Sequence, residues 1–105
     1  MMSKDEILKR LEKLNNIGKT ISGEIKGTTG KENKGKILDE VFHIVDENRY
    51  VIQKIQKNNN TIGFRFGYYT CDANYRQLRY GESSPIMGAS DFSILIYKAK
   101  EKGWF

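Results

Sequence analysis

The feature that most constrains the fold is a series of three β-type segments in the middle of the chain, separated by short turns. Residues 49–57 are rich in Tyr, Val and Ile, residues 61–70 alternate aromatic with small or charged side chains, and residues 75–82 resume that alternation. Residues 58–60 (three asparagines) and 71–74 supply turn residues. Because connections this short join antiparallel neighbours, the sequence predicts a three-stranded meander.

Two segments near the ends of the chain predict helices. Ser3 and Glu6 have the spacing of a capping box, and apolar side chains then recur at helical spacing, which predicts a helix near residues 3–16. A second apolar stripe predicts a helix near residues 88–102. Gly103 follows it, and glycine favours the left-handed conformation that ends many helices.

Residues 37–47 are ambiguous, because β-branched side chains stand at positions with a helical period. The apolar residues are Ile37, Leu38, Val41, Phe42 and Val45. We interpret the segment as a third helix, and a strand that ends in a turn at residues 46–49 is the alternative. Residues 18–36, rich in glycine and lysine, predict a loop, and residues 20–25 within it could add a short edge strand.

The expected architecture is therefore one α+β domain that spans residues 1–105. Its sheet has three or four antiparallel strands, and its helices lie near residues 3–16, 37–47 and 88–102. A chain of 105 residues has enough material for a single hydrophobic core but not for two. We find no internal repeat that would indicate a second unit.

Composition narrows the functional class. The net charge of +5 favours anionic partners, and twelve aromatic residues argue against disorder. No apolar run approaches the roughly 18 residues of a membrane-spanning helix, and the first residues do not resemble a secretory signal. The only cysteine, Cys71, excludes an internal disulfide. These features predict an intracellular, cytoplasmic protein that does not associate with a membrane.

The most informative functional pattern lies on the hairpin of the second and third segments. If residues 70–74 form the turn, Arg65 lies opposite Arg79, and Phe66 faces the core together with Leu78. The outer face then carries Gly63, Arg65, Gly67, Tyr69, Tyr75, Gln77 and Arg79. Two arginines directly opposite each other repel and weaken a hairpin, which points to a role in binding rather than in stability.

Arginine forks bind phosphate, tyrosine rings stack on bases, and the glycines leave the backbone accessible. This face therefore predicts a non-catalytic module that binds nucleic acid or a nucleotide. The competing structural interpretation is that a helix covers the face and that the arginines bridge to its carboxylates. The alternative function is a small accessory or inhibitor protein that binds another protein through its sheet edge or through the aromatic C-terminus, Trp104 and Phe105.

Other motifs are incomplete. Residues 30–36 match half of a phosphate-binding loop, but Ile37 stands where Ser or Thr must hold Mg²⁺. His43 and Cys71 are single residues of their types, and no spacing indicates a zinc site. The sequence therefore predicts no catalytic residue, no metal and no cofactor.

Overall fold

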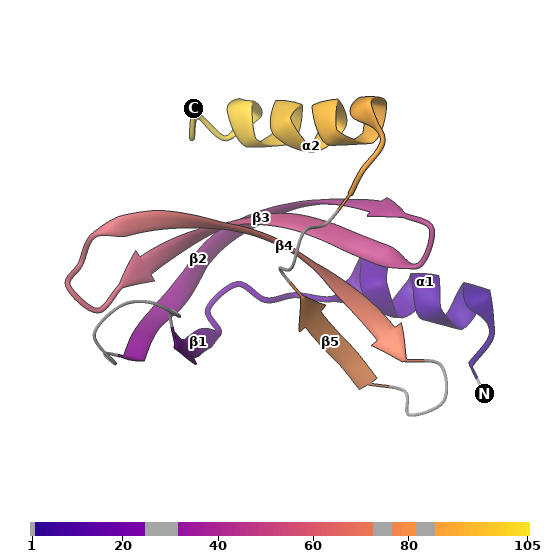
Figure 1. Ribbon diagram of the computed structural model, residues 1–105, viewed down its shortest axis with the longest axis horizontal. Helices are drawn as coiled ribbons and strands as arrows, with labels where there is room; N and C mark the ends of the chain where they lie inside the picture. The colour runs from indigo at the N-terminus through magenta and orange to yellow at the C-terminus, as the bar shows by residue number, and fades with distance from the viewer. Residues whose placement is uncertain (1, 25–31, 73–76, 82–85) are drawn as a thin grey trace.

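The computed structural model describes residues 2–24, 32–72, 77–81 and 86–105. Within them the elements are, in chain order, α1 (Lys4–Lys13), β1 (Thr20–Glu24), β2 (Glu32–Val45), β3 (Asn48–Lys57), β4 (Ile62–Asp72), β5 (Gln77–Gly81) and α2 (Ala89–Glu101). The strands form one antiparallel sheet in the order β1-β2-β3-β4-β5 (Figure 1). The α+β class is confirmed, and the described sheet has five strands rather than three or four.

The two helices lie on opposite sides of the sheet (Figure 1). On the α2 side, Leu95 and Ala99 are fully buried and belong to one cluster with Val41 and Ile52. On the α1 side, the helix contributes Leu11 to a smaller cluster that contains Cys71 and Ile7. Each side of the sheet therefore has its own small hydrophobic core. None of the helices in the described residues is long and apolar enough to cross a membrane.

Both helix ends that the sequence indicated have the expected geometry. The Ser3 side chain accepts a hydrogen bond from the Glu6 N–H at 3.2 Å, as a capping box requires. Gly103 is left-handed, with φ of 76°, and its N–H donates to Lys100. The Trp104 N–H donates to Ala99, which completes a Schellman motif and turns the chain back toward the sheet.

The predicted helix at residues 37–47 is wrong, because these residues belong to β2 and the turn that follows it. A β-bulge shifts the register at Leu38, between the pairs Ile37–Ile55 and Asp39–Lys54. The bulge interrupts the two-residue alternation, and β2 has buried apolar residues on both of its sides, so apolar residues fall at positions that imitate a helical period. The alternative, a strand followed by a turn, is correct, and the turn contains left-handed Asp46.

The glycine-rich segment is only partly a loop. Its early portion forms β1, which pairs with β2 and confirms the short edge strand. Its last residues already belong to β2, so the loop predicted over residues 18–36 is too long. Residues 25–31 lie outside the described residues, and with them lies the first part of the incomplete phosphate-loop motif at residues 30–36.

Candidate functional site

The hairpin register differs from the one that the sequence suggested, and this separates the two arginines. In the structure Thr70 pairs with Arg79 and Tyr69 pairs with Tyr80, so the predicted Arg65–Arg79 pair is wrong. The register is displaced by five residues, and an odd displacement moves every β5 side chain to the other side of the sheet. Arg65 therefore lies on the α1 side and Arg79 lies, exposed, on the α2 side.

Arg65 is committed to contacts within the protein. Its Nε donates to Gln53 Oε1 at 2.8 Å, and its guanidinium carbon lies 3.9 Å from the centroid of the Tyr80 ring. Gly67 lacks the Cβ that would collide with Tyr80, and a Cβ at Gly63 would meet the Lys57 side chain. The two glycines thus make room for the protein's own side chains rather than for a ligand.

The remaining predicted residues of this face are dispersed. Tyr69 Oη accepts a hydrogen bond from Gln53 Nε2 at 2.9 Å and packs against the α1-side cluster. Gln77 pairs with Asp72 at the end of β5, and Tyr75 lies outside the described residues. The structure therefore brings Arg65, Gly63, Gly67 and Tyr69 to one side of the sheet but does not place Arg79 with them.

A buried polar network occupies this side instead. Arg49 and Glu40 form an ion pair at 2.6 Å, and their side chains are only 4% and 3% exposed. Gln53, which is fully buried, donates to Glu40 Oε1 at 2.6 Å. Asn16, after α1, donates to the same oxygen at 3.0 Å. Buried charges are tolerated where they are paired and hydrogen-bonded, and here both Nη atoms of Arg49 and the Glu40 carboxylate have partners, whereas the Arg49 Nε is buried without one among the described residues.

Arg49 also joins the sheet to α1. Its Nη1 donates to the Leu11 carbonyl at 2.7 Å, which lies in the last turn of the helix, where carbonyls lack intrahelical partners. Its guanidinium carbon also lies 3.5 Å from the centroid of the Phe42 ring. The structural interpretation of the hairpin face is therefore partly right, since α1 packs against this side of the sheet. The arginine that meets a carboxylate is Arg49, and that carboxylate belongs to β2 rather than to a helix.

Sequence reasoning missed this network because its members come from three separate segments of the chain: β2, β3 and the residues after α1. The available signal was weak: Arg49 and Gln53 alternate with Val51 and Ile55 in β3, so two polar side chains share a side with two buried aliphatic ones. Such a pattern indicates a polar side chain that must find partners inside the protein. The partners themselves cannot be identified from one strand.

A second candidate surface lies on the side of the sheet that α2 covers. It is the part of that side that extends beyond the C-terminal end of α2. Lys54 pairs with Phe64, and Gln56 pairs with Lys36 on one strand and with Ile62 on the other. All five side chains therefore project from the same side of neighbouring strands. We call this the sheet-end surface, and its members are Lys36, Lys54, Gln56, Ile62, Phe64, Trp104 and Phe105.

The sheet-end surface combines a cluster of three aromatic rings with two lysines. The Phe64 centroid lies 5.4 Å from the Trp104 ring and 5.8 Å from the Phe105 ring. Phe64 is 45% exposed and Phe105 is 65% exposed. Asp39, on the same side of the sheet, is paired with Lys102 at 3.2 Å, which offsets its negative charge. The surface thus offers ring faces beside two lysines.

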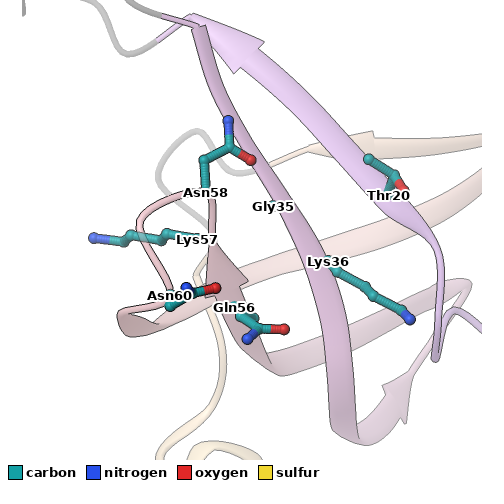
Figure 2. A pocket seen from close by; sticks show the side chains of 7 residues that line it. All are labelled: Thr20, Gly35, Lys36, Gln56, Lys57, Asn58 and Asn60. Carbon is teal, nitrogen blue, oxygen red and sulfur yellow. The ribbon is translucent and has the colours of Figure 1, made fainter.

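A pocket of about 310 Å³ opens at the edge of this surface (Figure 2). It is lined by Thr20, Gly35, Lys36, Gln56, Lys57, Asn58 and Asn60, and we call it the amide pocket. Among the described residues, its lining includes two lysines and no carboxylate. Lys36 and Gln56 project from the α2 side, whereas Lys57 points away from Lys36 (Figure 2).

His43, the only histidine of the sequence, contacts a side chain of α2. His43 Nε2 lies 2.9 Å from Asp91 Oδ1, which ties β2 to the first turn of α2. Tyr50 pairs with His43 across the strands. Burial raises the pKa of Tyr50, and the negative charges of Tyr68, Asp46 and Asp91 raise it further. Within the described residues, no three His, Cys, Asp or Glu side chains are grouped to hold a metal ion.

The fold places this chain among α+β proteins with a meandering antiparallel sheet between two helices. Comparison with the models of known families gives no match. The searches of curated proteins and of solved structures also give no match. Function must therefore be argued from the surfaces of this chain alone.

Proposed function

We propose that the protein is a non-catalytic module that binds a single strand of nucleic acid on the sheet-end surface. The observation that carries the proposal is the exposed pair of rings, Phe64 and Phe105, with Lys54 directly opposite Phe64. Lys36 lies further along the same side of the sheet, on β2. Bases stack on aromatic rings, and lysines neutralise phosphates with release of counterions. The net charge of +5 adds a long-range attraction for a polyanion.

The strand register also supports this proposal, because it sets a ring and a lysine at a spacing that suits one nucleotide. Lys54 and Phe64 are direct cross-strand partners, so their Cβ atoms are about 5 Å apart. A base that stacks on Phe64 therefore keeps its phosphate within reach of the flexible Lys54 ammonium. Ligand binding on the α1 side has less support, since Arg65 already donates to Gln53 and stacks on Tyr80.

Loss of an exposed ring is expected to weaken strand binding without unfolding the protein. Phe105→Ala and Phe64→Leu should each raise the Kd by roughly 5- to 150-fold, because stacking on one ring contributes about 1–3 kcal/mol per base. Tyr97→Ala is the matched control, since that ring is 63% exposed but stands on the outer side of α2. Fluorescence anisotropy with a labelled strand of about ten nucleotides measures the affinities. A Tyr97→Ala effect as large as that of Phe105→Ala would contradict the proposal.

A second candidate function is the binding of another protein through the aromatic C-terminus. Phe105 is exposed. Further along the same side of β4, Phe66 forms an edge-to-face pair with Phe92 of α2, with ring centroids 6.2 Å apart. Rings arranged in this way suit an apolar protein interface as well. Salt separates the two functions, because binding through phosphates weakens steeply as salt rises and an aromatic protein interface does not.

A further inference from the structure

We infer that the amide pocket accommodates one nucleotide of the bound strand and discriminates among bases. This inference rests on the proposed function and adds to it a sequence preference. The first support is chemical. Three of the lining residues, Gln56, Asn58 and Asn60, carry side-chain amides, and each amide offers both a donor and an acceptor. Paired donors and acceptors of this kind match the edges of nucleobases.

None of these amides forms a hydrogen bond within the described part of the chain, and those of Asn58 and Asn60 are exposed. Asn59, between Asn58 and Asn60, accepts hydrogen bonds from the Thr61 N–H and hydroxyl at 3.2 and 2.5 Å, so it holds the turn. Gln56 is half-buried, and within the described residues its amide has no hydrogen-bond partner, nor have those of Asn58 and Asn60. A half-buried amide without a partner is one that a ligand can satisfy.

The turn that presents the amides is anchored by its backbone. The Asn60 N–H donates to the Lys57 carbonyl at 2.9 Å, and the Lys57 N–H donates to the Thr61 carbonyl at 2.8 Å. Asn60 itself is left-handed, with φ of 64°, a conformation that asparagine tolerates better than most residues. The backbone of the turn is thus held in place before binding, which lowers the entropic cost of ordering it.

The size and position of the pocket agree with a single nucleotide at one end of a strand-binding surface. A volume of about 310 Å³ is at the lower limit of small-ligand pockets. Gln56 and Ile62 are cross-strand partners, and Ile62 and Phe64 are successive residues on the same side of β4, about 7 Å apart. A nucleotide in the pocket is therefore next to a base stacked on Phe64, and Lys36 is placed to meet its phosphate.

The test compares strands that differ only in base. Oligodeoxyadenylate, oligodeoxycytidylate and oligodeoxythymidylate of about ten nucleotides are titrated at several salt concentrations. The wild-type protein should bind the three strands with different affinities. The lowest and highest Kd should differ by roughly 5- to 150-fold, the discrimination expected of one bidentate hydrogen-bonded contact between a side chain and a base. The double variant Gln56→Ala/Asn60→Gly should bring the three affinities together and leave the salt dependence unchanged. Glycine at position 60 preserves the left-handed backbone.

Lysine variants separate the phosphate contact from base discrimination. Lys36→Ala should reduce the slope of log K against log salt by about 0.7 and leave the ranking of bases intact. Lys100→Ala is the matched control, because Lys100 is exposed on α2 and does not line the pocket. Circular dichroism and thermal melting establish that each variant is folded.

Each outcome decides between the two hypotheses. Equal wild-type affinities for the three strands, or a ranking that survives Gln56→Ala/Asn60→Gly, overturn the inference and leave the proposed function standing. Failure of every strand to bind at low salt overturns both. Deoxynucleoside monophosphates are titrated as well. If they bind as tightly as the strands, the pocket binds a free nucleotide and the inference about a strand is wrong.

Discussion

Replacement of Arg49 by alanine is expected to lower the free energy of unfolding by about 3–5 kcal/mol, because it leaves a buried carboxylate without its partner. Glu40 is 3% exposed and lies 2.6 Å from Arg49. The same guanidinium satisfies the Leu11 carbonyl at the end of α1, which also loses its donor. A domain of this size has a total stability of about 5–15 kcal/mol, so the variant should be close to unfolded at moderate temperature.

Chemical denaturation measures this loss, and Arg79→Ala is the control. Arg79 is exposed on β5, and its removal should change the free energy of unfolding by less than about 0.5 kcal/mol. Arg49→Lys should cause an intermediate to large loss in the free energy of unfolding, because a lysine ammonium cannot reproduce the guanidinium fork that reaches Glu40 and the Leu11 carbonyl together. An Arg49→Ala protein as stable as Arg79→Ala would show that the network is not buried in solution.

The second large effect is expected at Leu95 in the middle of α2. Leu95 is fully buried against the sheet, and Leu95→Ala should lower the free energy of unfolding by about 2–5 kcal/mol through lost burial and a residual cavity. Its neighbour Ile94 has a side chain of the same size and is 42% exposed. Ile94→Ala should therefore cost much less.

Denaturant midpoints of the two variants test the orientation of α2 directly. Leucine and isoleucine differ in helix propensity by only a few tenths of a kcal/mol, so a larger difference between the two variants reports burial. A larger loss for Ile94→Ala than for Leu95→Ala would mean that α2 presents a different face to the sheet. In that orientation Trp104 and Phe105 would no longer contact Phe64, and the sheet-end surface would not exist as described.

Most elements of the fold could be predicted from local sequence. The capping box at Ser3, the left-handed Gly103 and the turn asparagines are local signals, and each is found where it was expected. The strand at residues 32–45 was missed, because a bulge at Leu38 and burial on both sides remove the alternation by which a strand is recognised.

The candidate site was less predictable than the fold. Arg65 and Tyr69 were expected on a binding face, but α1 packs on that side and the two side chains both contact Gln53. The proposed surface depends on Phe105 meeting Phe64, and forty residues separate these rings in the chain. No periodicity within one element reports such a contact.

The sequence by itself determined the two helices near the ends of the chain, the three strands β3, β4 and β5, where most of these elements end, and the excess positive charge. Those properties depend on backbone propensity, capping and short-range alternation, which act over a few residues. Only the tertiary structure decided the β4–β5 register, the side of the sheet that each helix covers, and hence which polar side chains are buried with Arg49 and which remain beside Phe64. The physical reason is that a strand has two sides and an odd displacement of its register exchanges them, so packing between distant segments selects the side that faces solvent.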